Sequence, residues 1–126
     1  MADLSRDLIE RHWTLANKRE WNEFSELLSD DLKYELPQTR EYAESGAAYL
    51  EMFRTWPGEW SASIRMLVCE SQQAVCVIEF AVGVEVMTGI SVFGIKDGRI
   101  NQVTDYWPAP YEPPPRMTPL LKRRAQ

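Results

Sequence analysis

A single aspartate interrupts what otherwise looks like the last strand of a sheet. Residues 98–107 read GRINQVTDYW, and the aspartate is Asp105. Aspartate is uncommon in strands, and burying an ionised carboxylate costs several kcal/mol unless it is paired or hydrogen-bonded. Position alone leaves two interpretations open. Asp105 either accepts a backbone or tryptophan N–H at the open end of the strand, or it marks a site where a carboxylate with a raised pKa moves protons.

Other kinds of chemistry lack the residues that they need. Two cysteines, Cys69 and Cys76, and one histidine are too few for a cysteine-rich zinc site or a disulfide framework. The sequence also contains no G-x-S-x-G nucleophile motif, no phosphate-binding loop and no dinucleotide-binding fingerprint. We therefore expect no metal site, no cofactor and no acyl-enzyme chemistry.

Three helices and five strands are expected to position Asp105. Apolar residues at three- and four-residue steps predict helices over residues 3–18, within 21–30, and over 46–56 with Ser45 as the cap. Alternation predicts a strand in LKYELP (32–37), three strands' worth of sequence over 60–95, and a last strand after the turn at Asp97-Gly98. The expected order is ααβαββββ, an α+β fold.

The turn at Asp97-Gly98 also predicts how the last two strands pair. A two-residue turn places Ile90 opposite Asp105 and Val92 opposite Val103. One face of the sheet then carries Ile90, Val92, Val103, Asp105 and Trp107, and the other carries Phe93, Ile95, Ile100 and Tyr106. Because both faces are apolar and the helices cover only one, we expect a homodimer packed sheet to sheet through the other. The pattern alone does not decide which face meets the helices, and the face of Phe93, Ile95, Ile100 and Tyr106 is the candidate for the dimer.

Length and charge define the broad class of protein. The 126 residues suit a single domain, with a core at about 3–108 and a proline-rich tail over 108–126 that should lie on the surface as an extended strap. A net charge of -5 favours neither nucleic acid nor an anionic membrane as a partner. With no apolar run of signal-peptide or membrane-spanning length, the cytoplasm is the simplest location.

Several stretches together resemble the nuclear transport factor 2-like superfamily, in its SnoaL-like branch. They are LLSDDLKYELP, the helix GAAYLEMF and the closing strand GRINQVTDYW, and their order and spacing extend over almost the whole chain. The resemblance implies a cone-shaped fold, in which a curved mixed sheet wraps around the helices and leaves a deep apolar pocket, usually in a dimer. The superfamily includes ketosteroid isomerases, limonene-epoxide hydrolases and polyketide cyclases, so the fold alone does not define the activity.

The resemblance implies two catalytic candidates, Asp105 and His12. Asp105 in DYW matches the acid-base aspartate of a DYF-type motif in the epoxide hydrolases, but their other catalytic arginine and aspartate fall on Phe80 and Val82. His12 in RHWTLAN lies near the position of the oxyanion-binding tyrosine of the isomerases. The position of their catalytic base is occupied here by Leu36, and that of their oxyanion-binding aspartate by about Ile90. Neither complete mechanism is therefore present. If His12 and Asp105 meet in the pocket, the pair suits acid-base chemistry near neutral pH.

Aromatic side chains are expected to line the pocket and to bind an apolar small molecule. Gln38 and Arg40 in PQTRE, at the expected mouth, could donate hydrogen bonds to an oxygen of the ligand, or could belong to a solvated loop. The expected wall residues are Tyr34, Tyr49, Phe53, Trp56, Phe80 and Trp107.

Three functions remain open from the sequence. The first is a cofactor-independent isomerase, cyclase, dehydratase or hydrolase acting on an apolar, oxygen-bearing substrate. The second is a non-catalytic module that binds a hydrophobic ligand, and the third is a dimerisation scaffold.

Overall fold

The computed structural model describes residues 2–125, which form three helices and six strands. The helices are α1 (Ala2–Lys18), α2 (Trp21–Glu26) and α3 (Gly46–Thr55). The strands are β1 (Leu28–Leu36), β2 (Glu41–Ala43), β3 (Trp60–Cys69), β4 (Gln73–Val82), β5 (Glu85–Lys96) and β6 (Arg99–Tyr106). The α+β class is confirmed, and β2 adds a short strand to the predicted order, within the turn region after Leu36. No helix of the described residues is long and apolar enough to span a membrane.

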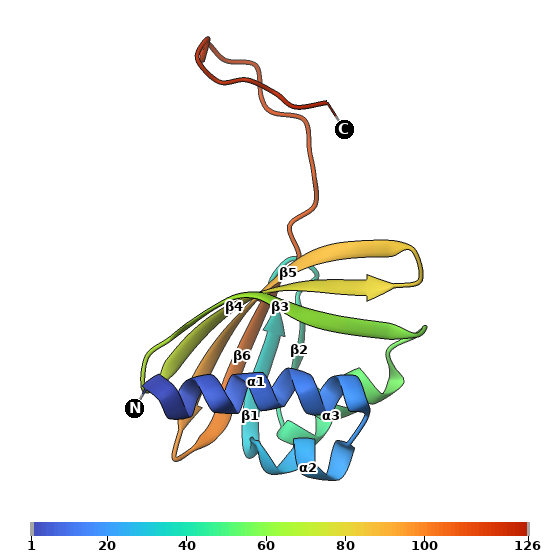
Figure 1. The fold of residues 1–126 in the computed structure, drawn as a ribbon, viewed down its shortest axis with the longest axis vertical. Coiled ribbons are helices and arrows are strands. Elements are labelled where there is room, and N and C mark those ends of the chain that lie inside the picture. The colour runs from blue at the N-terminus through green and yellow to red at the C-terminus, as the bar shows by residue number, and fades with distance from the viewer. Residues whose placement is uncertain (1, 126) are drawn as a thin grey trace.

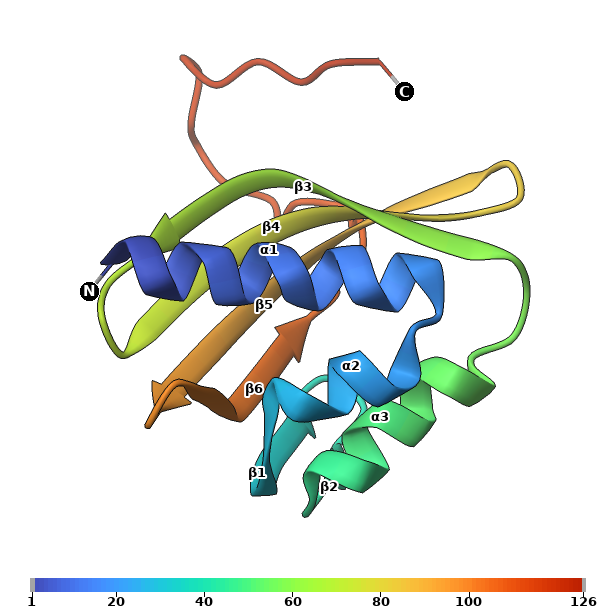
Figure 2. The same cartoon turned by 60° about the horizontal axis from the view of Figure 1, so that its bottom comes forward.

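One curved, mixed sheet wraps around the helices. Its strand order is β2-β1-β6-β5-β4-β3, and every neighbouring pair is antiparallel except β1 and β6. All three helices lie on the same side of this sheet, and α1 packs mainly against β3 (Figures 1 and 2). The inner face of the sheet and the helices enclose a single core.

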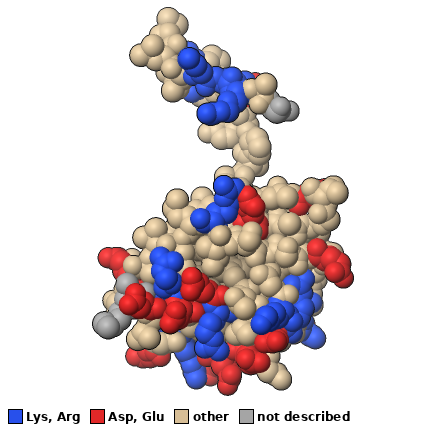
Figure 3. Space-filling view, in the orientation of Figure 1, with Lys and Arg blue, Asp and Glu red and all other residues tan. Residues whose placement is uncertain are grey.

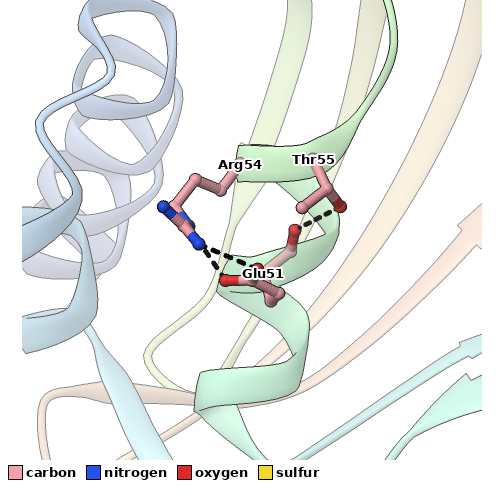
Figure 4. A network of polar contacts seen from close by, with 3 residues as sticks. All are labelled: Glu51, Arg54 and Thr55. Carbon is pink, nitrogen blue, oxygen red and sulfur yellow. Dashed lines mark hydrogen bonds and ion pairs between the residues drawn. The ribbon is translucent and has the colours of Figure 1, made fainter.

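Local sequence explains the helices. α1 buries Leu8, Ile9, Trp13 and Ala16 of the stripe that the periodicity predicts, whereas Leu4, also predicted in this stripe, is exposed. The Ser45 side chain caps α3 by accepting a hydrogen bond of 3.0 Å from the Ala48 N–H. On the solvent side of α3, Arg54 donates to both carboxylate oxygens of Glu51, at 2.9 and 3.0 Å (Figure 4).

The boundary between α2 and β1 differs from the prediction. α2 ends at Glu26, and β1 already begins at Leu28, four residues before the predicted strand. Leu27 and Leu28 are both buried, and Leu28 pairs with Ile100 of β6. The apolar pair therefore enters the core as the start of a strand, because tertiary pairing outweighs the helical spacing.

The register between β5 and β6 also differs from the prediction. Lys96 faces Arg99 as expected, but an irregularity between Gly94 and Ile95 shifts the pairing, so Asp105 faces Ser91 instead of Ile90. Such a bulge adds one residue to β6 and reverses the side that each later residue faces. Phe93, Ile95 and Ile100, which we predicted on the dimer face, are instead buried against the helices.

The outer face of the sheet carries two cross-strand rows over β3, β4, β5 and β6. One row is Met66, Val77, Ile90 and Tyr106, and the other is Val68, Val75, Val92 and Thr104. Seven of these eight residues are apolar, and several are well exposed, for example Met66 and Val68 at 58% each. This outer face lies on the side of the sheet away from the helices.

The proline-rich tail does not lie on the body as the predicted strap. Residues 108–125 contain no helix or strand and are all exposed. Figure 1 shows them leaving the end of β6 and projecting away from the sheet and helices. The strap prediction is therefore wrong for this structure.

Candidate functional site

Asp105 lies on the inner face of β6 and is only 4% exposed. Both of its carboxylate oxygens accept a hydrogen bond from a hydroxyl group. The Tyr34 hydroxyl of β1 donates to Oδ2 at 2.8 Å, and Ser91 Oγ, directly opposite on β5, donates to Oδ1 at 2.7 Å. The carboxylate is thus held by two neighbouring strands and keeps one or more free acceptor positions.

Burial makes Asp105 a stronger base than an ordinary aspartate. Loss of hydration raises its pKa from 3.8 to about 6, and the hydrogen bonds from Ser91 and Tyr34 act against this rise because they favour the charged form. A pKa near 6 leaves the carboxylate ionised at neutral pH and still able to accept a proton readily, which suits a general base.

Asp105 opens into a narrow cavity between the sheet and α3. The cavity volume is about 20 Å³, which is room for about one water molecule. Aromatic and aliphatic side chains form most of its lining, together with Asp105 and the hydroxyl of Tyr34. The lining residues are Trp13, Tyr34, Met52, Phe53, Trp56, Phe80, Asp105 and Trp107.

A larger open groove adjoins this cavity. It has a volume of about 680 Å³ and runs between β1, β2 and the start of α3. Tyr34, Met52 and Trp56 line both spaces, so these side chains form the wall between the cavity and the groove. Trp56 is 39% exposed, and the Met52 side chain is flexible, so the wall consists of side chains with room to move.

Trp107 closes another side of the cavity and depends on a glycine. Its ring lies flat on Gly89 of β5, where an added Cβ would stand 2.7 Å from a ring carbon. Its backbone N–H donates to the Gln38 side-chain oxygen at 2.5 Å, which ties the end of β6 to the turn after β1. Gln38 therefore supports the cavity wall through Trp107 and does not line the cavity itself.

His12 is completely buried, and its neighbour is a tyrosine. Its Nε2 and the Tyr49 hydroxyl are 2.8 Å apart, and Nδ1 has no hydrogen-bond partner among the described residues. Aromatic rings surround the imidazole, with ring centroids of Trp13 at 4.4 Å and Phe24 at 4.9 Å. Burial lowers the pKa of His12 from 6.5 to about 3, so the ring is neutral at physiological pH.

The structure does not join His12 directly to Asp105. The hydrogen-bonded pair of His12 and Tyr49 lies beside the pair of Tyr34 and Asp105, and the two tyrosine rings pack with centroids 5.0 Å apart. The charge of Asp105 helps to raise the pKa of the Tyr49 hydroxyl, after the larger effect of burial. The sequence left open whether His12 and Asp105 meet, and the structure places two tyrosines between them.

The other predicted site residues fall into two groups. Five of the aromatic residues, Tyr34, Phe53, Trp56, Phe80 and Trp107, line the cavity, whereas Tyr49 is fully buried behind it. Arg40 is exposed in the turn before β2, with a φ of 66°, and lines neither the cavity nor the groove.

Sequence reasoning missed Ser91, Met52, Trp13 and Gly89. Ser91 becomes visible only when the bulge is known, because the predicted register placed it on the opposite face from Asp105. Met52 and Trp13 could have been found, because both lie in predicted helices directly beside the chosen residues Phe53 and His12. Among the described residues, no group of three or more His, Cys, Asp or Glu side chains lies close enough together to hold a metal ion.

Chemically, the arrangement offers one proton acceptor in an apolar space. Asp105 is the ionisable carboxylate of the cavity, and the Tyr34 hydroxyl beside it can donate a hydrogen bond. These groups are sufficient for proton transfer to or from a small ligand, and for binding its polar end.

Comparisons with known proteins agree with this geometry. Residues 9–103 match the family described as the SnoaL-like domain. A crystal structure from Kribbella flavida, provisionally assigned as a ketosteroid isomerase, shares 34% identity over 99% of this chain and 93% of its own, with a TM-score of 0.91. No curated protein matches the sequence significantly.

Two more distant structures share the fold alone. An LEH-like epoxide hydrolase from M. tuberculosis has 17% identity and a TM-score of 0.71, over 85% of this chain and 84% of its own. A protein from Xanthomonas campestris, provisionally assigned as a polyketide cyclase, has 18% identity and a TM-score of 0.68, over 85% and 92%.

Proposed function

The chain belongs to the SnoaL-like family of the nuclear transport factor 2-like superfamily, and we propose that it is a cofactor-independent acid-base enzyme. Its substrate would be a small apolar molecule that carries a carbonyl or similar oxygen. The observation that carries this proposal is Asp105, a buried carboxylate with a pKa of about 6 at the end of an otherwise apolar cavity. The provisional assignment of the Kribbella protein as an isomerase is consistent with this class of reaction.

In the proposed reaction, Asp105 removes a proton from the carbon next to the carbonyl group of the substrate. The apolar walls favour this transfer, because the carboxylate loses little hydration when the substrate enters. Once Asp105 is protonated, it no longer needs the hydrogen bond from Tyr34. That hydroxyl can then donate to the negative charge that develops on the substrate oxygen.

Admission of a substrate requires the cavity to widen. A volume of about 20 Å³ does not hold a ligand of several carbon atoms, whereas the adjoining groove has about 680 Å³. We propose that Met52 and Trp56 move aside and join the two spaces into the deep apolar pocket that the family resemblance implies. Binding would then run from the groove down to Asp105.

The test is the exchange of substrate hydrogens with solvent. A panel of small apolar ketones is incubated with the protein in D2O, and loss of the signal of the protons next to the carbonyl is followed by NMR. We expect acceleration by the wild type and a loss of about a hundredfold in Asp105→Asn, the usual scale for an acid-base group. Asp97→Asn, in the exposed β5–β6 turn, is the matched control and should exchange like the wild type.

A non-catalytic ligand-binding module is the second candidate. The observation in its favour is that Asp105 is the only acidic or basic residue that lines the cavity among the described residues. Ketones that quench tryptophan fluorescence without any exchange of their protons would support this function and overturn the enzyme. Absence of both binding and exchange would favour the third candidate, a dimerisation scaffold.

We also propose that the protein is a homodimer, now through the corrected outer face. The two rows from Met66 to Tyr106 and from Val68 to Thr104 would pack against the same rows of a second copy. Their exposed apolar side chains support this proposal, since the chain's own helices cover only the inner face. A cytoplasmic location and the absence of nucleic-acid or membrane partners stay predictions from the sequence.

A further inference from the structure

The C-terminal arm, residues 108–125, exposes apolar side chains that nothing in its own chain covers. Met117 is 93% exposed, Leu120 94% and Leu121 65%. These three residues form what we call the arm tip. Isolated apolar residues are common on surfaces, but three of them within five residues of a projecting segment indicate a contact surface.

The arm tip has a defined local shape. Arg123 forms a two-pronged ion pair with Glu112, and the Leu121 N–H donates to the Thr118 carbonyl at 3.0 Å. These contacts close residues 112–123 into a loop that holds the apolar side chains outward. The prolines before and within the loop further restrict its backbone, which lowers the entropy lost when the loop binds.

Arm and body carry opposite charges. Residues 108–126 contain four Lys and Arg against one Glu, a net charge of +3, while residues 1–107 contain ten against eighteen Asp and Glu, a net charge of -8. Figure 3 shows the basic side chains of the arm grouped well apart from the body. A basic arm is attracted to an acidic body, and the body of a second copy is as acidic as its own.

The direction and length of the arm suit a second copy seated on the outer face. In Figures 1 and 2 the arm lies beyond the sheet from the three helices, which is the side that the outer face presents. At about 3.1 Å per residue, an extended stretch from Pro108 to Met117 spans about 30 Å. That is close to the width of a domain of about 100 residues, so the arm tip can cross most of a neighbouring body.

We propose that the arm of each copy docks on the body of the other in an arm-exchanged homodimer, with Met117, Leu120 and Leu121 packed on the partner's sheet beside the two rows through which the copies meet. The inference rests on the proposed sheet-to-sheet homodimer, and it adds the segment that clasps it. The match to the Kribbella crystal structure covers 99% of this chain, so it extends into the arm.

A photo-crosslink identifies which copy the arm touches. Benzoylphenylalanine replaces Leu120 in the full chain, and the irradiated protein is separated on a denaturing gel. We expect a covalent dimer whose crosslinked peptide maps to β3, β4 or β5 of the other copy. The same label in place of Glu26, an exposed residue of α2 on the helix side, is the control and should give only monomers.

The dissociation constants of dimer variants distinguish the contribution of the arm from that of the sheet-to-sheet interface. The double variant Leu120→Ser with Leu121→Ser should raise the dissociation constant of the dimer by about ten- to a hundredfold, as expected when two leucines that are buried in the dimer are replaced by serine. Thr118→Ser is the matched control within the loop. Val92→Lys places a charge in the middle of the outer face and should give monomers.

Each combination of results supports or overturns either the arm inference or the sheet-to-sheet dimer. If Val92→Lys is monomeric while the double serine variant dimerises like the wild type and Leu120 crosslinks only within its chain, the arm inference is wrong and the sheet dimer stands. If the serine variant becomes monomeric and Val92→Lys stays dimeric, the arms alone hold the dimer. A wild type that is monomeric at tens of micromolar overturns both.

Discussion

The His12 and Asp105 regions are two buried polar centres built in different ways. Asp105 has a hydroxyl donor for each oxygen and faces a cavity, whereas His12 has one partner and is enclosed by aromatic rings. Loss of hydration shifts both pKa values toward the neutral form, upward for Asp105 and downward for His12. Burial therefore produces a usable base in one place and an inert ring in the other.

The difference shows what a buried group needs in order to do chemistry. Asp105 keeps a pKa within reach of neutral pH because Ser91 and Tyr34 stabilise its charged form. His12 has no such stabilisation, and its contacts suit a structural role in the core. A histidine and an aspartate buried in the same core are thus not sufficient evidence for an acid-base pair.

The largest expected effect concerns acid stability through His12. Its folded pKa of about 3 lies below the unfolded value of 6.5, so its contribution is complete above pH 6.5 and is lost as the pH falls toward 3. The full loss amounts to about 5 kcal/mol of unfolding free energy, of which about 3 kcal/mol falls between pH 7 and 4. Urea unfolding between pH 7 and 4 should show a steeper decline in the wild type than in His12→Gln, which cannot titrate. Equal slopes would mean that His12 is accessible to protons in the folded state.

Asp105 should act in the opposite direction. Its folded pKa of about 6 lies above the unfolded value of 3.8, so its contribution is present below pH 3.8 and is lost as the pH rises through 6. The wild type should therefore lose about 3 kcal/mol relative to Asp105→Asn between pH 4 and 7. The comparison uses urea unfolding of both proteins in the same buffers. If the wild type instead gains stability relative to Asp105→Asn as the pH rises from 4 to 7, the folded protein stabilises the charged form of Asp105 and lowers its pKa.

Removing the Tyr34 hydroxyl, one of the two hydrogen-bond donors to Asp105, should raise the pKa of Asp105 and so increase the difference between the pKa values of Asp105 and His12. Tyr34→Phe deletes the hydrogen bond to Asp105 Oδ2, and because a hydrogen bond to a charged group contributes about 1.5–3 kcal/mol, the pKa of Asp105 should rise by about one to two units. The titration is followed by carbon NMR of the aspartate carboxyl. Tyr42→Phe is the control, since Tyr42 is 71% exposed. An unchanged pKa would show that Ser91 alone holds the carboxylate.

The smallest expected effect tests whether the cavity wall is adaptable. Gly89→Ala places a Cβ 2.7 Å from the Trp107 ring, which must shift and cost about 1 kcal/mol or somewhat more. Ligand binding at Asp105 should change, while the His12 ring, whose nearest ring contacts are with Trp13 and Phe24, should keep its NMR shifts. Thr88→Ala, at the neighbouring exposed position, is the control. A shift at His12 as well would mean that the two centres form one rigid unit.

The sequence predictions are accurate for features that depend on residues close together in the chain, and less accurate for features that depend on distant residues. The stripe of α1 and the Ser45 cap of α3 depend on residues within a few turns; the cap is confirmed, and so is the stripe except at Leu4. The pairing of Asp105 with Ser91 depends on one extra residue in β6, which leaves no clear mark in the sequence. That single residue is why Ile95 and Ile100 lie inside although we predicted them on the dimer face.

By itself, the sequence determined the α+β order, the family resemblance and the exceptional position of Asp105, because periodicity, caps and turns are properties of neighbouring residues. Only the tertiary structure decided the partners of Asp105, since Tyr34 is 71 positions away along the chain and reaches it through the parallel pairing of β1 with β6. The same holds for the burial of His12 and for the small volume of the cavity. These features depend on how curved strands and helices pack together, and packing is a property of the whole chain.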